Sequence, residues 1–137
     1  VKTLSRFVQE WSREFGVAAD FHSQGLEDIR IARDTEINLY RITQEALNNV
    51  LKHARASRVA VVLECRADQL VLVIEDDGVG FDREAAGAKD RGIGLIGMQE
   101  RAALIGGMLE IEATPGAGTT VFVRAPLTKG PGGAGHQ

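Results

Sequence analysis

Three short polar motifs follow one another along this chain, and together they restrict its fold more than any other feature. Gln44–Asn49 lies in a segment with helical periodicity, Asp76–Gly80 directly follows an apolar segment, and Arg91–Leu95 precedes another helical pattern. One glycine pattern alone is a weak signal, because such patterns recur in unrelated proteins. The order of the three motifs instead predicts one binding site built from a helix, a strand end and a glycine-rich turn.

The length and composition allow one globular domain. The chain has 137 residues, enough for one core, and its 44% hydrophobic and 26% charged residues are ordinary for such a domain. No apolar run approaches the roughly 20 residues needed to cross a bilayer. No basic run favours nucleic acid, and the net charge is -3. We therefore expect a cytoplasmic domain without nucleic-acid or membrane contacts, including where a parent protein is membrane-anchored.

Hydrophobic periodicity predicts three amphipathic helices and one short strand. Apolar residues recur at helical spacing in Leu4–Phe15, Thr35–Ala54 and Leu95–Ile105. Between the first two, Val17–Phe21 is a short extended candidate, and the polar stretch His22–Asp34 is typical of a loop. The helix over residues 35–54 has one apolar side, so its polar side remains available for a site.

Segments rich in Val, Leu and Ile predict two antiparallel hairpins, which are Arg58–Cys65 with Leu70–Glu75 and Met108–Ala113 with Thr119–Ala125. The helix between the hairpins permits a crossover, so we expect a mixed sheet. Packing this sheet against the helices gives an α+β fold, a two-layer sandwich with one face covered by about three helices. We place the domain at residues 1–128 and expect the Gly-rich tail, residues 129–137, to be disordered.

Glu45 and Asn49 are the first candidates for chemistry. Residues four apart are neighbours on one face of a helix. The amide oxygen of Asn49 is a hard ligand suited to a magnesium ion that also binds substrate phosphates. The Glu45 carboxylate, one turn away, can accept a proton from an attacking nucleophile or orient a metal-bound water. A solvated helix face is the alternative, and it applies with most force to Arg41 and Lys52.

Asp76 is the candidate for base recognition. It follows the apolar residues Leu72–Ile74, so we expect its carboxylate on the floor of a cleft. There it would accept a hydrogen bond from the exocyclic amine of adenine, whereas guanine would present an acceptor oxygen. Gly78 and Gly80 permit a tight turn close to the base and sugar. A simple hairpin turn is the alternative, but no strong strand follows directly. These residues therefore predict an ATP site.

Gly92–Gly97 also matches the dinucleotide-binding pattern G-x-G-x-x-G. That fingerprint requires an apolar strand just before it, whereas residues 81–91 are polar, charged and Ala-rich. Too little chain follows Glu110 and Glu112, the acids at the expected distance, to complete a doubly wound sheet. We instead expect the glycines to open a helix whose free N–H groups hold the ATP phosphates. Residues 81–91 would then form a short mobile lid.

The stretch Arg41–Leu127 resembles the catalytic ATP-binding domain of bacterial sensor histidine kinases, in the superfamily that includes gyrase, Hsp90 and MutL. Glu45–Ala54 resembles its N box, Asp76–Gly80 its first glycine box and Gly92–Leu95 its second. The phrases QEALNNV and GLIGMQER are similar to the subfamily that signals to response regulators with helix-turn-helix output domains. The resemblance implies the Bergerat-type α+β fold, with ATP and Mg²⁺ as cofactors.

Carried over by motif position, the resemblance also implies roles for individual residues. Glu45 would be the catalytic carboxylate, Asn49 the magnesium ligand and Asp76 the adenine-reading residue. Thr119 would support the adenine pocket through water. The other implied nucleotide contacts are positions of the two glycine boxes and a basic position near the phosphates, namely Gly78, Gly80, Gly92, Gly94, Leu95 and Lys52. His53 adjoins Lys52 beside an apolar face, so a structural role and a phosphate-proximal role both stay open.

In this family the phosphoacceptor histidine belongs to a separate helical dimerisation domain, in a motif where His is followed by an acid. Neither His22 nor His136 lies in such a motif. The resemblance therefore implies a protein histidine kinase catalytic domain that is inactive in autophosphorylation by itself. Its partners would be the histidine-bearing dimerisation domain of the same parent kinase and a response regulator downstream.

Two other functions use the same nucleotide boxes. One is a stand-alone serine kinase and binding module of the anti-sigma type, and the other is an ATPase that drives conformational change, as in the gyrase and chaperone branches. The short lid and the GLIGMQER phrase argue against the ATPase, as does the lack of a long segment after Leu127 for a transducer domain. A helical domain with a phosphoacceptor histidine upstream would separate the histidine kinase from the anti-sigma alternative.

Overall fold

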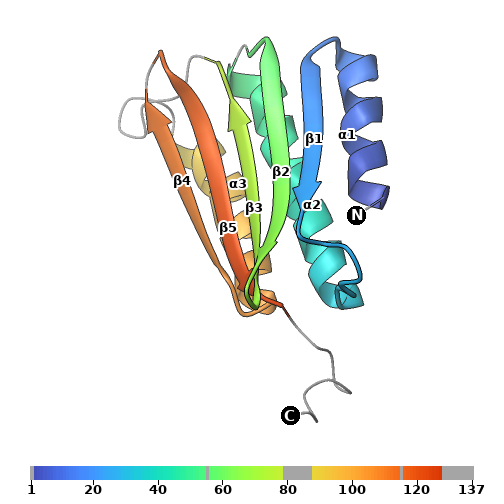
Figure 1. The fold of residues 1–137 in the computed structure, drawn as a ribbon. Helices are drawn as coiled ribbons and strands as arrows, with labels where there is room; N and C mark the ends of the chain where they lie inside the picture. The colour runs from blue at the N-terminus through green and yellow to red at the C-terminus, as the bar shows by residue number, and fades with distance from the viewer. Residues whose placement is uncertain (1, 55, 79–87, 115, 128–137) are drawn as a thin grey trace.

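The computed structural model of the chain describes residues 2–54, 56–78, 88–114 and 116–127. These residues form a five-stranded sheet with the helices packed against one of its faces, which confirms the predicted two-layer α+β fold (Figure 1). In chain order the elements are α1 (Lys2–Phe15), β1 (Ala18–Gln24), α2 (Arg33–Asn49), the π-helical turn η1 (Val50–Ala54), β2 (Arg58–Arg66), β3 (Gln69–Asp76), α3 (Ala88–Leu104), β4 (Met108–Thr114) and β5 (Gly118–Pro126).

The helices keep the amphipathic character that their sequences predict. α1 buries Leu4, Val8 and Trp11 at helical spacing and ends before Gly16, whose φ of 71° favours glycine. α2 buries a continuous stripe toward the sheet, which consists of Thr35, Asn38, Leu39, Ile42, Thr43, Ala46 and Leu47. Its opposite side remains partly or fully exposed, so α2 can both cover the core and present polar groups.

The strand order is β1-β2-β3-β5-β4. β2 pairs with β3 and β4 with β5 in antiparallel fashion, so both predicted hairpins are confirmed. The predicted mixed sheet is also confirmed, but its parallel pair is β1 with β2, joined through α2. The crossover through α3 instead leads from β3 to β4, and β5 lies between those two strands. The long antiparallel pairing of β3 with β5 places the second hairpin beside the first.

The core lies between the sheet and the helices. Alternate residues of the central strands are buried there, namely Val59, Val61, Leu63, Leu70, Leu72, Ile74, Val121, Val123 and Ala125. Fully burying a side chain such as Leu or Val contributes roughly 1.5–3 kcal/mol. Because side chains alternate along a strand, Asp76 falls on this same helix-covered face, two residues after Ile74. The alternation of buried residues along β3 therefore places the Asp76 side chain on the helix-covered face of the sheet.

The predicted loop over His22–Asp34 is wrong at both ends. β1 continues to Gln24, in parallel register with β2 as far as Glu64, and α2 already begins at Arg33. The additional strand residues are polar and show no strand pattern of their own. Their pairing with β2 gives their backbone groups hydrogen-bond partners, and this tertiary contact overrides composition.

The third helix also begins earlier than predicted. α3 starts at Ala88, so Gly92 and Gly94 lie inside it and do not open it. Each glycine inside a helix costs about 1 kcal/mol relative to alanine, and α3 contains three, Gly92, Gly94 and Gly97. That cost is offset where α3 packs on the core, with Met98 and Ala102 each 1% exposed. Gly80, most of the predicted lid and the predicted disordered tail lie outside the described residues.

Candidate functional site

Asp76 is the last residue of β3 and is only 8% exposed. Its Oδ1 accepts a hydrogen bond of 2.8 Å from the backbone N–H of Gly78. Burial raises the pKa of Asp76, and backbone hydrogen bonds from Gly78 and Thr119 oppose this shift. A carboxylate has about four lone-pair sites, so these two donors leave it able to accept from a ligand. The predicted burial of this acid is confirmed, and its place on the floor of a nucleotide cleft stays a prediction.

Thr119 lies directly opposite Asp76 in the pairing of β3 with β5, and it is half-buried. The residue before it, Gly118, has a φ of 97°. A Cβ atom on Gly118 would collide with the backbone carbonyl oxygen of Asp76. Gly118 is therefore a residue that sequence reasoning missed as part of the site. Its signal in the sequence was the pair of glycines in Gly116-Ala117-Gly118 just before a strand.

Asp77 was missed as well, and it ties two segments together. Its carboxylate accepts hydrogen bonds from the backbone N–H of Ser57 at 2.9 Å, the Ser57 hydroxyl at 2.8 Å and the backbone N–H of Arg58 at 2.9 Å. Its own N–H donates to the Arg58 carbonyl oxygen at 3.2 Å. The Ser57 hydroxyl and the backbone donors lower the pKa of Asp77. Asp77 thus holds the segment after η1 against the turn that follows Asp76.

The hydrogen bonds of Asp77 with Ser57 and Arg58, here called the clamp, bring the end of the α2–η1 segment to the strand end that carries Asp76. Glu45 and Asn49, the last residue of α2, are both half-buried, and Lys52 in η1 is exposed. The predicted end of this helix at Ala54 is confirmed, but its last turn is π-helical. Such turns occur frequently at functional sites. The side chain of His53 lies outside the described parts of the structure.

The second glycine box occupies the first half of α3. Leu95 is half-buried and packs against the core. The expectation that Gly92 and Gly94 open this helix is wrong, because the unpaired N–H groups of a helix belong to its first four residues. In this structure those residues are 88–91. A contact of Gly92, Gly94 or Leu95 with a nucleotide stays a prediction.

The residues on α2 fit a magnesium ion of the kind that ATP brings with it. Within residues 2–54, 56–78, 88–114 and 116–127, no cluster of three or more His, Cys, Asp and Glu side chains is placed to hold a metal. Magnesium is commonly held by one or two protein oxygens together with substrate phosphates and water. The half-buried amide of Asn49 can supply one such oxygen.

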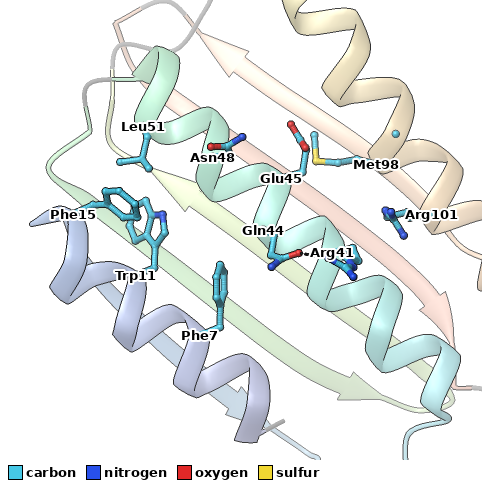
Figure 2. A pocket seen from close by; sticks show the side chains of 11 residues that line it. Phe7, Trp11, Phe15, Arg41, Gln44, Glu45, Asn48, Leu51, Met98 and Arg101 are labelled. Atoms are coloured by element: carbon cyan, nitrogen blue, oxygen red, sulfur yellow. Dashed lines mark hydrogen bonds between the residues drawn. The ribbon is translucent and has the colours of Figure 1, made fainter.

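A groove crosses the outer side of α2, and Glu45 lies in it (Figure 2). Its volume is about 510 Å³. The α2 residues on its floor are Arg41, Gln44, Glu45, Asn48 and Leu51 of the adjoining turn. Side chains of α1 line one side and residues of α3 line the other. Glu45 is therefore accessible to a group that enters between the helices.

None of the described helices is both long enough and apolar enough to cross a membrane.

The five-stranded mixed sheet with helices on one face defines a domain of the two-layer α+β class. The chain belongs to the family of histidine kinase-, DNA gyrase B- and HSP90-like ATPases, whose pattern matches residues 34–129.

Curated relatives of the chain are named as histidine kinases. It is 35% identical over 132 residues to the signal transduction histidine-protein kinase/phosphatase DegS of Bacillus subtilis, an alignment that covers 93% of this chain and 34% of that protein. It is 40% identical over 102 residues to the sensor histidine kinase LiaS of the same organism, which covers 74% of this chain and 28% of LiaS. The chain thus spans about a third of the length of the curated relatives that it matches.

Solved structures share the fold at lower sequence identity. The histidine kinase domain of a blue-light activated histidine kinase from Erythrobacter litoralis superposes with a TM-score of 0.71 at 23% identity, covering 92% of this chain and 64% of that one. The ATP-binding domain of PrrB from Mycobacterium tuberculosis gives 0.69 at 19% identity and covers 93% of each chain. At these identities the likeness concerns the fold.

Proposed function

We propose that this domain binds Mg-ATP and transfers its γ-phosphoryl group to a histidine on a separate dimerisation domain of a sensor histidine kinase. The domain would comprise residues 1–128, and the phosphorylated histidine would then supply a response regulator in two-component signalling. The observation that carries the nucleotide part is Asp76, a buried carboxylate that retains acceptor capacity between Gly78 and Thr119. The curated relatives, which are named as histidine kinases, support the choice of acceptor.

Asp76 accounts for adenine selectivity in this proposal. Its carboxylate accepts a hydrogen bond from the exocyclic amine of adenine, and guanine would leave a buried acceptor facing another acceptor. Gly118 keeps a side chain away from the Asp76 backbone, and Gly78 donates to the carboxylate without covering it. Thr119 lies opposite Asp76 in the pairing of β3 with β5, which supports a role for Thr119 in holding a water at the base.

The transfer itself takes place at the α2 end of the site. An imidazole nitrogen of the acceptor attacks the γ-phosphorus, a P–N bond forms, and the bond to the β–γ bridging oxygen breaks as ADP leaves. Glu45 accepts the proton from the other ring nitrogen. Asn49 would hold the magnesium ion, which would supply positive charge to the phosphates. Lys52 adds a positive charge beside them, and no covalent intermediate with the domain forms.

Labelled ATP tests this assignment. Incubated alone, the chain should bind ATP and form almost no phosphoprotein, because no acceptor is held in line with the γ-phosphate. With a separate helical domain carrying the acceptor histidine, it should form an acid-labile, base-stable phosphohistidine. Glu45→Ala should slow this transfer by about 10²–10⁴-fold. Glu14→Ala, at an exposed position of α1, is the matched control and should transfer normally.

Other products would contradict the proposal in distinct ways. An acid-stable phosphoserine on a partner protein would indicate a serine kinase of the anti-sigma type. Rapid release of phosphate without any phosphoprotein would indicate an ATPase cycle of the gyrase or chaperone kind.

A further inference from the structure

A second pocket lies at the end of the helix layer where α1 and α2 both begin (Figure 1), and neither Glu45 nor Asn49 lines it. Its volume is about 330 Å³, within the range of roughly 300–1,000 Å³ that is typical of small-molecule sites. At about 30 Å³ for each water of the liquid, this space corresponds to about eleven non-hydrogen atoms. The pocket therefore has the size of a small organic molecule and is too small for a nucleoside triphosphate.

The deepest side chains of this pocket belong to the apolar core. Leu4 of α1, Leu39 of α2 and Leu63 of β2 line it and are 6%, 3% and 2% exposed. Ile31, from the segment between β1 and α2, is half-buried, whereas Ile37 is 47% exposed. A ligand with an apolar body would cover Ile37 and remove its surface from water. The lining therefore favours an apolar body for the ligand.

Two arginines of α2 give the same pocket an excess of positive charge. Arg33 and Arg41 line it and are exposed, and Glu36 is the acid of the lining, so two positive charges face one negative charge. Within the described parts of the chain, the Arg33 guanidinium has no ion-pair or hydrogen-bond partner, and Arg41 donates to the neutral Gln44 Oε1 at 3.2 Å. A guanidinium forms its strongest hydrogen bonds with a carboxylate. The charges therefore favour an anionic group on the ligand.

Tyr40 adds a polar group to the lining. Its side chain is half-buried, and its ring lies edge-on to Phe7 with 5.2 Å between the centroids. Its hydroxyl makes no hydrogen bond to any residue that the structure describes. Tyrosine hydroxyls that are removed from water usually have a hydrogen-bond partner. A carboxylate bound in the pocket can supply such an acceptor.

We propose that this pocket binds a small amphipathic carboxylate, whose apolar body of about eight carbon atoms contacts Leu39 and Leu63 and whose carboxylate pairs with Arg33. An apolar cavity with a few convergent polar groups is the usual form of a small-molecule site. The pocket contains neither Asp76 nor Glu45. This binding is therefore separate from nucleotide binding and phosphoryl transfer.

The first test uses octanoate, which has the size of the pocket, as the probe. The full 137-residue chain contains one tyrosine, Tyr40, and one tryptophan, Trp11, so each ring gives its own NMR signals. Monomeric octanoate should shift the Tyr40 signals in a saturable way. It should leave the signals of Trp11, which lines the other groove, nearly unchanged. No shift at Tyr40, or equal shifts at both rings, would overturn the proposal.

The charge of the ligand is tested with octanamide, a neutral analogue of the same length. Octanamide should bind about tenfold more weakly than octanoate, because it makes no charged hydrogen bond with Arg33. Equal affinities of the two probes would mean that the arginines do not select an anion, and the proposed ligand class would be wrong.

Arg33 has a matched control in Arg30, an exposed arginine that does not line the pocket. Arg33→Gln should weaken octanoate binding about tenfold, to the level of octanamide. Arg33→Lys keeps the charge without the paired donors and should lose only about threefold. Arg30→Gln removes the same charge and should bind octanoate like the unchanged chain. Equal losses in Arg33→Gln and Arg30→Gln, or no loss in Arg33→Gln, would contradict the proposed contact.

The apolar lining has a matched pair of surface variants. Ile37→Ser alters the pocket, and Phe15→Ser alters an equally exposed residue outside it, at 47% and 46% exposure. Neither residue is buried, so both variants should fold like the unchanged chain by circular dichroism. Ile37→Ser should weaken octanoate binding about fivefold, and Phe15→Ser should not. Equal effects of the two substitutions would place the probe elsewhere on the molecule.

The length of the probe measures the depth of the pocket. From butanoate to octanoate, each added CH₂ group should raise the affinity by up to about fourfold, the effect of burying it. Beyond octanoate the gain should stop, because the pocket is full. A gain that continues unchanged to dodecanoate would indicate an open apolar surface and would overturn the proposal.

Two other occupants of the pocket give distinct results. If Ile37→Ser lowers self-association in sedimentation experiments, the pocket is a contact between copies of the chain. If octanoate binds the 137-residue chain but not a longer parent protein, another segment of that protein covers the pocket. Either result would overturn the proposed small-molecule site.

Discussion

At the strand end of the site, Asp76 and Asp77 accept hydrogen bonds from backbone groups of residues 57–58, 78 and 119. Around α2, by contrast, the guanidinium of Arg41 donates to the side-chain amide of Gln44, and that of Arg101 donates to the side-chain amide of Asn38. The strand end thus joins three distant segments through the main chain, and the groove is lined by side chains on three helices. A small rigid ligand is recognised best by preformed donors and acceptors. A protein partner is recognised by exposed apolar and charged side chains around a groove.

The largest expected effect is at the close approach of β5 to β3. Gly118→Ala combines a φ of 97° with a collision against the Asp76 carbonyl oxygen, so it should lower the free energy of unfolding by roughly 3 kcal/mol or more. Gly116→Ala has a similar φ of 81° but no atom within 4 Å of its Cβ, so it should cost only about 1 kcal/mol. Urea denaturation checks both, and equal losses would show that the approach to Asp76 is not rigid.

The next largest effect is expected on the binding of the adenine base. Asp76→Asn should weaken ATP and ADP binding by about 10–100-fold. The substitution removes a hydrogen bond to a charged group, which contributes roughly 1.5–3 kcal/mol, and the new amide can face the adenine amine with its own N–H donor. The unchanged chain should bind GTP far more weakly than ATP. Isothermal titration calorimetry measures both nucleotides. Equal affinity of the unchanged chain for ATP and GTP would remove Asp76 as the base-reading residue.

A smaller, more selective effect is expected on α2. Asn49→Ala should lower magnesium-dependent ATP affinity about tenfold, the value of one lost ligand at roughly 1.4 kcal/mol, and slow transfer. Binding of ADP without metal should change little, because Asp76, the proposed adenine contact, lies at the strand end of the site and not on α2. Asn48→Ala, one residue earlier and exposed in the groove, should keep the magnesium dependence. A magnesium dependence that Asn49→Ala leaves intact would make Asn49 an ordinary surface residue.

The smallest effect tests the clamp. Hydrogen bonds from Ser57 and Arg58 hold the pKa of Asp77 below its ordinary value of 3.8. A carboxyl group with a lowered folded-state pKa contributes stability above its unfolded pKa and loses it as the pH falls through the folded pKa. Asp77→Asn should therefore be less stable than the unchanged chain at pH 6, and the difference should shrink as the pH falls below 3.8. Urea denaturation between about pH 3 and pH 6 measures it. A difference that is constant with pH would mean that the Asp77 charge is not involved.

The sequence by itself determined the helices with a clear apolar side, both hairpins and the buried position of Asp76. Spacing along one helix or strand decides which side chains share a face, so the apolar stripe of Leu4–Phe15 could be predicted without coordinates, and Leu4, Val8 and Trp11 are buried whereas Phe15 is 46% exposed. The nucleotide boxes were equally local, because Glu45 with Asn49 and Asp76 with Gly78 lie within one turn of each other along the chain.

Tertiary structure alone decided how distant segments meet. The polar end of β1 became a strand because β2 pairs with it, and α3 started at Ala88 in a helix whose later turns pack on the core. Gly118 reached the Asp76 backbone only through the pairing of β5 with β3. The groove needed the separation of α1 from α2. Contacts of this kind depend on sheet order and helix packing, which the spacing of residues within one segment does not encode.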